Sequence, residues 1–257
     1  MASIAITGSA GGIGRATVER LEGAGHRVIG IDVRDAEVAA DLTTAEGRRA
    51  MVRQVEELCA GALDGLVVGA GMSGDDGAAI VSVNYFGAVA TMVGLRPLLE
   101  HGTAPSVVAI SSNSTTTQPG YPVEIAEWCL AGDEPRARLI AADDGLGAYA
   151  ASKLALALWV RRQAPGADWM GAGIRLNAIA PGFIDTPLTE GQWDFISSLG
   201  EVYPMPAGRA GRADEVAGLL AYLLSPEAGF FSGSVVVMDG GTEAALRPDA
   251  WPRPLGH

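Results

Sequence analysis

The sequence of 257 residues predicts an α/β fold: a single doubly wound parallel sheet of about seven strands, with helices on both faces. Three observations indicate this fold. Short strand-like runs alternate along the chain with helix-length segments, which is the order that builds a helix-covered parallel sheet. The strand-like runs are apolar throughout, as expected for strands that are buried on both faces. A cluster of glycines joins the first strand-like run to the first helical segment.

Strands and helices are predicted in a regular order, and we expect one domain over residues 1–257. The predicted strands are Ile4–Thr7, Arg27–Ile31, Leu66–Ala70, Val107–Ile110, Ile174–Ile179 and Val235–Met238. The predicted helices are Ile13–Ala24, Ala45–Ala60, Ser82–Leu99, Tyr149–Gln163 and Asp214–Leu224.

Two long segments interrupt this order, residues 113–148 and 187–212. The first is polar and mixed, with helix-like stretches at Val123–Leu130 and Glu134–Ala142. The second mixes aromatic and apolar residues with turn formers. Long irregular segments in a compact domain are more often functional than accidental. Our hypothesis is that the first segment is a subunit-contact element, within a homodimer or homotetramer.

Composition and charge exclude several classes of protein. A hydrophobic fraction of 48% supplies a core, and a net charge of −12 would repel nucleic acid. The two cysteines and three histidines show no metal-ligand spacing, so we predict no metal. No apolar run reaches the roughly 18 residues that span a bilayer, so we predict no membrane partner. The N-terminus lacks a basic signal-peptide region, and we expect a cytoplasmic protein.

The glycine cluster predicts a dinucleotide site of the Rossmann type. Gly8 permits a tight turn after the first strand, Gly12 lets the backbone approach a pyrophosphate, and Gly14 lets the helix pack closely on the strand. The helix start at Gly12, Ile13 and Gly14 offers unpaired N–H groups and a positive dipole end to phosphates. An anionic cofactor is therefore compatible with the acidic chain.

Asp32 ends the second strand, 18 positions after Gly14, and predicts the identity of the cofactor. A carboxylate there accepts both ribose hydroxyls of adenosine and repels a 2′-phosphate, which favours NAD over NADP. The alternative is that Asp32 only caps a turn. Asp41 and Leu42 follow, and could hold the adenine edge by an acceptor and an apolar wall. The alternative for Asp41 is an ordinary loop aspartate.

Tyr149 and Lys153 have the spacing of a proton-transfer pair. Positions four apart share one face of a helix, so the phenol and the ammonium point into one cleft. A phenol has a pKa of about 10, which suits proton exchange poorly at neutral pH. We expect Lys153 and an oxidised nicotinamide to lower the pKa of Tyr149. The tyrosine would then be the general base in alcohol oxidation and the general acid in ketone reduction.

Eight motifs in order make the chain resemble the short-chain dehydrogenase/reductase family over nearly its whole length. They are the glycine turn at 7–14, Asp32, the pair Asp41-Leu42, the helical segment 82–87, Ile110-Ser111-Ser112, Tyr149 with Lys153, Pro181 to Thr186, and Asp239-Gly240-Gly241. The chain departs from the family after the strand at 66–70, where Ala70 and Gly71 follow Val68-Gly69 instead of paired asparagines.

The resemblance implies a role for each matching residue. Ser112 would orient the substrate oxygen and stabilise charge on it. Lys153 would also bind the hydroxyls of the nicotinamide ribose, and Asn84 would hold a water that relays protons to solvent. The remaining cofactor contacts that it implies are Ala70, Gly71, Pro181, Gly182, Ile184 and Thr186. The reaction is then hydride transfer between NAD(H) and a secondary alcohol or ketone.

Residues 113–148 are longer than the connection usual in the family, so the resemblance identifies them as an insertion. A similar insertion, with similar segments at 30–38 and 40–48, makes the chain look like the bacterial 3α-hydroxysteroid dehydrogenase/carbonyl reductases. This resemblance implies an apolar cyclic substrate such as a 3α-hydroxysteroid. A terpene alcohol or another alicyclic alcohol would fit equally, because the matching segments lie in the cofactor half.

Large apolar side chains in residues 187–212 predict a lid over such a substrate. The predicted lid residues are Trp193, Phe195, Leu199, Tyr203 and Met205. The alternative is a helix face that packs on the core. Two other classes are alternatives: a catalytically inactive NAD-binding sensor, which has no chemical need for the full set of reacting residues, and a sugar epimerase, for which the chain lacks room for a further substrate domain.

Overall fold

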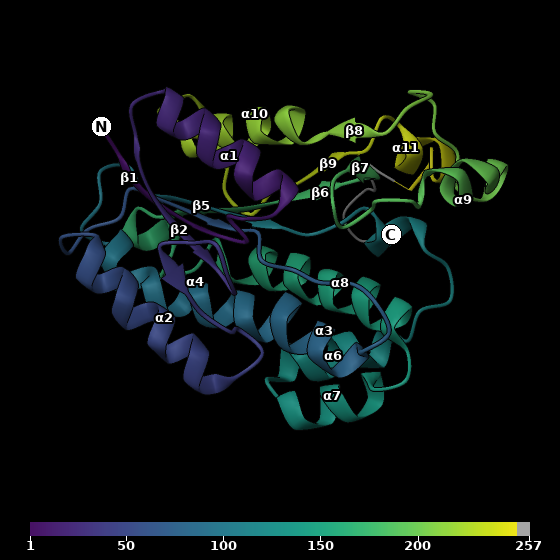
Figure 1. The fold of residues 1–257 in the computed structure, drawn as a ribbon, viewed down its shortest axis with the longest axis horizontal. Coiled ribbons are helices and arrows are strands. Elements are labelled where there is room, and N and C mark those ends of the chain that lie inside the picture. The colour runs from purple at the N-terminus through teal and green to yellow at the C-terminus, as the bar shows by residue number, and fades with distance from the viewer. Residues whose placement is uncertain (251–257) are drawn as a thin grey trace.

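Residues 1–250 of the computed structural model form a seven-stranded sheet with helices on both faces, which confirms the predicted fold class (Figure 1). All the strands are parallel, in the order β3-β2-β1-β4-β5-β6-β9. Their bounds are Ser3–Thr7 (β1), Arg27–Asp32 (β2), Val38–Ala39 (β3), Gly65–Val68 (β4), Ser106–Ile110 (β5), Arg175–Pro181 (β6) and Val235–Met238 (β9). The two-residue strand β3 was not among the predicted runs.

The helices form two layers, one on each face of the sheet (Figure 1). Helices α1 (Gly12–Gly23) and α10 (Ala213–Leu224) pack on one face. Helices α2 (Ala45–Leu58), α4 (Ala88–Leu99) and α8 (Gly145–Gln163) pack on the other. Short 3-10 turns lie at Met170–Ala172 (η2), Gly200–Val202 (η3) and Pro226–Ala228 (η4).

Alternate residues of each strand supply the two layers of the core. In β1, Ile4 and Ile6 belong to the cluster that contains Leu21 of α1, whereas Ala5 belongs to the cluster that contains Met51 of α2. This alternation follows from the pleat of a strand, which directs successive side chains to opposite faces. The sheet is therefore buried on both sides, and the apolar runs in the sequence have their physical explanation.

Two helices begin earlier than predicted. The helix predicted from Ser82 begins at Gly77 as α3 (Gly77–Val81), passes through a π-helical turn η1 (Ser82–Gly87) and continues as α4. Helix α8 begins at Gly145 instead of Tyr149. In each case an aspartate caps the first turn: a side-chain oxygen of Asp76 or Asp144 accepts a backbone N–H at 2.9 or 2.8 Å.

The helix Gly77–Leu99 is long and apolar enough to cross a membrane by length and composition, contrary to the expectation from the sequence. Of its most apolar window, 61% is buried inside the protein, against the sheet and neighbouring helices. Burial of this kind is typical of the central helix of a globular α/β domain, which is apolar all round.

Residues 113–148 fold into three helices, α5 (Ser114–Thr117), α6 (Val123–Ala131) and α7 (Glu134–Ala141). The two predicted helical stretches of this segment are thereby confirmed. Helix α6 packs on α8, and α7 packs on α3, so both lie against the protein's own chain on the α8 side of the sheet (Figure 1).

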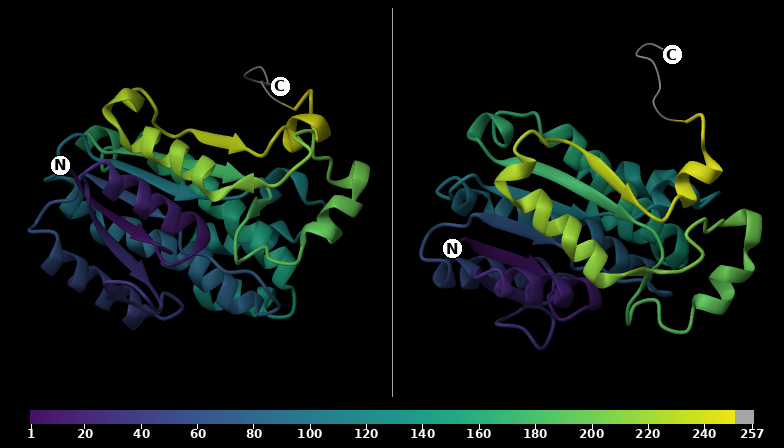
Figure 2. Two further views of the ribbon diagram at one scale, coloured as in Figure 1. Left: turned by 45° about the horizontal axis from the view of Figure 1, so that its top comes forward. Right: turned by 90° about the horizontal axis from the view of Figure 1, so that it is seen from above.

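Residues 187–212 leave the main body at one end, where they carry the short helix α9 (Trp193–Ser198) (Figure 2). Their two ends meet: β7 (Ile184–Asp185) pairs in parallel with β8 (Gly211–Arg212). Helix α11 (Thr242–Leu246) follows β9 at the same end of the molecule (Figure 1). The pairing of β7 with β8 thus joins the two ends of the segment, and α9 lies in the part of the chain between them.

We expect Gly14→Ala to destabilise the fold by roughly 1–3 kcal/mol, because the added methyl group would lie 1.9 Å from the Gly8 carbonyl oxygen. Urea unfolding would measure the change. Gly23→Ala is the matched control on the same helix, where no described atom beyond the adjoining helix backbone lies within 4 Å of the added carbon. Equal stability of the two variants would contradict the close packing of α1 on the first turn.

Candidate active site

The strand order reverses between β1 and β4, and the candidate site lies at the carboxyl ends of the strands around this point. Strand β1 pairs with β2 on one side and with β4 on the other. In open parallel sheets, such a reversal opens a crevice in which ligands bind. The turn at Gly8 follows β1, Gly69–Gly71 follows β4, and Ser111–Ser112 follows β5. Residues far apart in the chain thereby reach one crevice.

The glycine turn has little space for side chains. Gly8 has a φ of 76°, and a Cβ there would lie 2.8 Å from the backbone of Gly69 and Ala70. A Cβ on Gly12 would lie 2.7 Å from the side chain of Thr186. The predicted reason for Gly12 was the approach of a pyrophosphate, but in this structure the neighbour that requires glycine is Thr186. Gly14 packs on Gly8 and Ser9 of the turn, whereas the prediction placed the strand there, and Ile13 contacts the α1–α10 core.

The carboxylates of Asp32 and Asp41 both accept hydrogen bonds from backbone N–H groups of turns. The Asp32 carboxylate accepts the N–H groups of Ala10 (3.0 Å) and Val33 (2.7 Å), which ties the end of β2 to the glycine turn. One oxygen of Asp41 accepts both the N–H and the hydroxyl of Thr43, at 2.9 and 2.6 Å, and these bonds lower the pKa of Asp41. The alternative that Asp41 is an ordinary loop aspartate therefore has direct support, while Leu42 is buried beside it.

Asn84 lies in the π-helical turn η1 and is fully buried. Its Oδ1 accepts the N–H of Met72 at 2.9 Å, and its Nδ2 donates to the carbonyl of the same residue at 3.1 Å. A Cβ on Gly71 would lie 3.3 Å from both Asn84 Oδ1 and Lys153 Nζ. Gly71 therefore leaves open a space between Asn84 and Lys153 that any other residue would fill.

Lys153 is 4% exposed and its ammonium donates to the Ile110 carbonyl at 2.8 Å. In return, the Ser111 hydroxyl donates to the Lys153 carbonyl at 2.9 Å. Burial lowers the pKa of Lys153 to about 8, because the charged form loses hydration. Helix α8 is thereby attached to the end of β5 at the residue before Ser112.

Tyr149 is half-buried one helical turn before Lys153, and the Lys153 ammonium lies 5.9 Å from its ring centroid. Burial raises the pKa of Tyr149, and the Ser112 side chain opposes this rise through hydrogen bonding. The chain's own residues thus do not produce the predicted lowering of the pKa of Tyr149, because burial raises it more than the bond to Ser112 lowers it. Ser112 is buried, and its hydroxyl oxygen accepts the N–H of Ser114 at 3.2 Å.

The segment after β6 crosses the crevice. The N–H of Gly182 donates to the Met238 carbonyl at 3.0 Å, and a Cβ on Gly182 would lie 2.6 Å from the side chain of Asp239. Pro181 ends β6, and Ile184 is buried in β7. The N–H of Thr186 donates to the hydroxyl of Thr189 at 3.1 Å. The four predicted cofactor-binding residues of this segment therefore run from β6 to the glycine turn.

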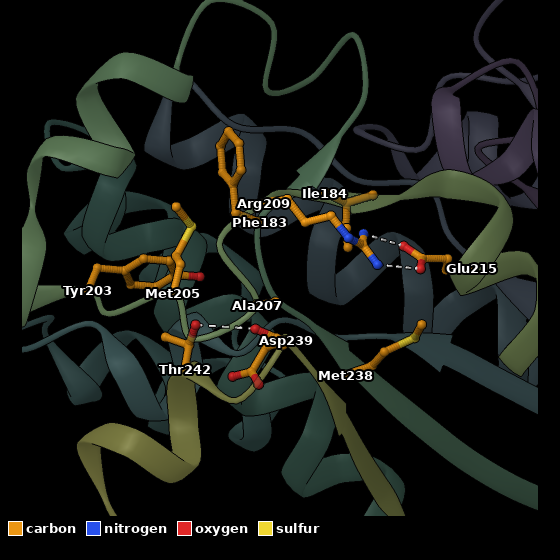
Figure 3. A pocket seen from close by; sticks show the side chains of 12 residues that line it. Phe183, Ile184, Tyr203, Met205, Ala207, Arg209, Glu215, Met238, Asp239 and Thr242 are labelled. Carbon is orange, nitrogen blue, oxygen red and sulfur yellow. Dashed lines mark hydrogen bonds and ion pairs between the residues drawn. The ribbon is translucent and has the colours of Figure 1, made fainter.

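A cavity of about 180 Å³ lies between the segment 187–212 and the turn after β9 (Figure 3). Of the predicted lid residues, only Tyr203 and Met205 line it; Phe195 is 65% exposed. Trp193 packs on Phe183, with ring centroids 6.1 Å apart. Figure 3 shows Arg209 and Glu215 on the opposite side from Tyr203, joined by two hydrogen bonds of 2.9 and 2.7 Å.

Asn113, Tyr203 and Asp239 form a polar network beside this cavity that the sequence analysis did not find. The Asn113 amide donates to the Tyr203 hydroxyl (3.0 Å) and to the Asp239 carboxylate (3.1 Å). Asn113 is buried, directly after Ser112. The network connects the segment 187–212 to the end of β5 and to the last strand. Among residues 1–250, no group of three His, Cys, Asp or Glu side chains is placed to hold a metal ion.

Comparison with known families matches residues 2–123 to short chain dehydrogenases and residues 137–243 to a family described as enoyl-(acyl carrier protein) reductase. A 3-alpha-hydroxysteroid dehydrogenase/carbonyl reductase of Comamonas testosteroni is 43% identical, over 96% of this chain and 99% of that protein. The chain belongs to the short-chain dehydrogenase family, as the motifs predicted. Residues 124–136, between the two matched ranges, lie within the predicted insertion.

One solved structure and one further relative support the same family. The 3-alpha-hydroxysteroid dehydrogenase of Pseudomonas sp. B-0831, in complex with NADH, superimposes with a TM-score of 0.88 at 42% identity, covering 96% of this chain and 99% of that chain. A cis-4-hydroxycyclohexanecarboxylate dehydrogenase of Sinomonas cyclohexanicum is 29% identical over 93% of this chain and 95% of its own length. The protein is an oxidoreductase of alcohols and ketones that uses a nicotinamide cofactor.

The buried ammonium of Lys153 predicts a specific dependence of stability on pH. Its pKa is about 8 in the fold and about 10.4 in an unfolded chain. Between these values the unfolded state binds more protons, so stability rises with pH. We expect the free energy of unfolding of the unaltered protein to gain roughly 1–3 kcal/mol relative to Lys153→Met between pH 7.5 and 10.5. The free energy of unfolding of both proteins would be measured in urea against pH. The same dependence on pH in both would show that the fold does not lower the pKa of Lys153.

Proposed function

We propose that the protein interconverts a secondary alcohol and its ketone on an apolar cyclic compound such as a 3α-hydroxysteroid, with NAD(H) as cofactor. The observation that carries the proposal is the convergence of Ser112, Tyr149, Lys153 and Asn84 at the ends of β4 and β5. The similarity to two 3-alpha-hydroxysteroid dehydrogenases over nearly the whole chain supports the substrate class.

The proposed proton path begins at the Tyr149 phenol. In oxidation the phenolate takes the hydroxyl proton of the alcohol, and in reduction the phenol returns a proton to the carbonyl oxygen. Ser112 lies beside the phenol and would hold the same substrate oxygen in place. The space between Asn84 Oδ1 and Lys153 Nζ, left open by Gly71, would hold the water that carries the proton onward.

The residues of the crevice fit a dinucleotide. The glycine turn and the start of α1 would hold the pyrophosphate, and Pro181, Gly182, Ile184 and Thr186 would hold the nicotinamide end. When bound, the nicotinamide accepts or supplies the hydride. Its positive charge in the oxidised form would offset the effect of burial on Tyr149.

NAD is proposed over NADP because the Asp32 carboxylate lies at the end of β2, beside the glycine turn. A carboxylate there would repel a 2′-phosphate, and its remaining lone pairs would accept ribose hydroxyls. The NADH complex of the similar Pseudomonas enzyme supports this choice. We also propose that the protein is cytoplasmic. It would form a homodimer or homotetramer, because Val123, Leu139 and Leu146 of the insertion are 51–77% exposed; mass measurement in solution decides between the two sizes.

The substrate would lie under residues 187–212, with Tyr203 and Met205 as the apolar wall. A terpene alcohol or another alicyclic alcohol is the alternative, and the similarity to a hydroxycyclohexanecarboxylate dehydrogenase favours a ring in either case. An inactive NAD-binding sensor would not require the buried Lys153, whose charge the fold holds at a cost in hydration.

Following NADH absorbance with NAD or NADP and a panel of 3-hydroxysteroids, terpene alcohols and cyclohexanols tests the proposal. We expect turnover with NAD and a 3α-hydroxysteroid. Tyr149→Phe should lower kcat at least about 1,000-fold and leave the Kd of NADH nearly unchanged, because only the proton carrier is lost. Tyr222→Phe, at an exposed tyrosine of α10, is the control. Comparable activity of the two variants would show that Tyr149 is not the proton carrier.

Tyr203→Phe tests the proposed lid. The change removes the hydroxyl that holds residues 187–212 to Asn113 while keeping the apolar ring. We expect the KM of the alcohol to rise about tenfold, the scale of one lost hydrogen bond of about 1.4 kcal/mol, with a smaller change in kcat. Phe195→Leu, on the exposed side of the same segment, should leave KM unchanged. An unchanged KM of the alcohol in Tyr203→Phe would show that the bond from Tyr203 to Asn113 does not contribute to substrate binding, contrary to the proposed lid.

A further inference from the structure

Arg48 is a buried cation on α2 that none of the proposed roles uses. The residue is 8% exposed, and its guanidinium contacts three other parts of the chain. Its Nε donates to the Leu42 carbonyl at 2.8 Å, and one terminal nitrogen donates to the carbonyls of Ser82 (2.9 Å) and Thr43 (3.3 Å). Both terminal nitrogens donate to Glu134, each at 2.7 Å.

Glu134 belongs to the insertion, at the first turn of α7. Its two oxygens and the guanidinium form a bidentate pair, the geometry in which arginine and carboxylate bind most strongly. Burial raises the pKa of Glu134, but its bonds to Arg48 and the charge of that residue outweigh burial, so the pKa lies below its usual value. Glu134 is therefore ionised at neutral pH and compensates the charge of Arg48.

Each carbonyl that Arg48 holds belongs to a segment of the proposed cofactor site. Leu42 is the predicted wall of the adenine pocket, and its Cβ lies 3.0 Å from the place where a Cβ on Gly87 would stand. Ser82 opens the π-helical turn two residues before Asn84. The guanidinium therefore connects the loop after β3 to η1, and Glu134 orients the guanidinium.

A buried ion pair is a poor source of stability by itself, since desolvation of both charges offsets their attraction. An arginine whose three nitrogens all donate, to one carboxylate and three carbonyls, has a different use, which is to fix the geometry of those groups.

We propose that Glu134 and Arg48 are positioning residues of the NAD site, through which the insertion holds the Leu42–Thr43 loop in its cofactor-binding position. The inference rests on the proposed function, in which NAD is the cofactor, and on the predicted contact of Leu42 with the adenine edge. It assigns the insertion a role inside its own subunit, in addition to any contact with another.

The test compares three variants of the full-length protein. Arg48→Met with Glu134→Leu removes both buried charges together, so that neither remains unpaired and the fold is retained. Glu134→Gln keeps the size and one acceptor of the side chain but removes its charge. Glu124→Gln is the control in the same insertion, where the exposed carboxylate accepts from the Trp128 indole. Thermal unfolding shows that each variant is folded, and nicotinamide fluorescence measures the Kd of NADH.

We expect the Kd of NADH and the KM of NAD to rise about tenfold in the double variant and by a smaller factor in Glu134→Gln, within the range seen when coupling residues are altered. The kcat at saturating NAD and the KM of the alcohol should stay within about twofold, since Tyr149 and Ser112 are untouched. Glu124→Gln should match the unaltered protein. If the pair had only a structural role, its removal in the double variant would lower the unfolding temperature without changing the Kd of NADH.

An unchanged Kd of NADH in the folded double variant would overturn the inference and leave the proposed function intact. Equal losses of NADH and alcohol binding would also overturn it, because the pair would then support the whole crevice. Failure of the unaltered protein to bind NADH at all would instead overturn the proposed function together with the inference.

Discussion

The attachment of helix α8 to the end of β5 is the interaction on which the reacting groups depend. The Lys153 ammonium bonds to the Ile110 carbonyl, and the Ser111 hydroxyl bonds to the Lys153 carbonyl, so helix and strand are joined in both directions. Because Tyr149 is one turn away on the helix and Ser112 is the next residue after Ser111, this attachment sets their separation. The Lys153 ammonium, which has no carboxylate partner among residues 1–250, thus both joins helix to strand and belongs to the proposed proton path.

A second set of contacts joins the two ligand regions of the crevice. Thr186 fills the space that a side chain at Gly12 would need, so the start of the proposed lid rests directly on the glycine turn. Asn113 then connects the far part of the same segment, at Tyr203, to Asp239 and the last strand. The position of the proposed lid therefore depends on the cofactor turn at one end and on the residue beside Ser112 at the other.

The insertion is closely integrated with its own subunit. Helices α6 and α7 cover α8 and α3, and Arg138 of α7 donates to the Ala78 carbonyl as well as to the Ser82 hydroxyl. Together with the Arg48–Glu134 pair, these contacts surround the π-helical turn that carries Asn84. Such a turn widens the helix and is frequent at functional sites. Two arginines bond to Ser82 at the start of this turn. Arg48 of α2 donates to its carbonyl, and Arg138 of α7 donates to its hydroxyl.

The local signals in the sequence determined the sheet, most of its helices and the reaction class. Apolar runs, glycines at Gly8, Gly12 and Gly14, and the spacing of Tyr149 and Lys153 depend on neighbours within a few positions, so they can be read along the chain. Two helix starts were wrong because their caps, Asp76 and Asp144, lie outside the motifs that marked the helices. Only the tertiary structure decided the partners of Arg48, Asn113 and Lys153. Those contacts join residues 86, 126 and 43 positions apart, and no local pattern specifies which buried polar groups will meet across the crevice.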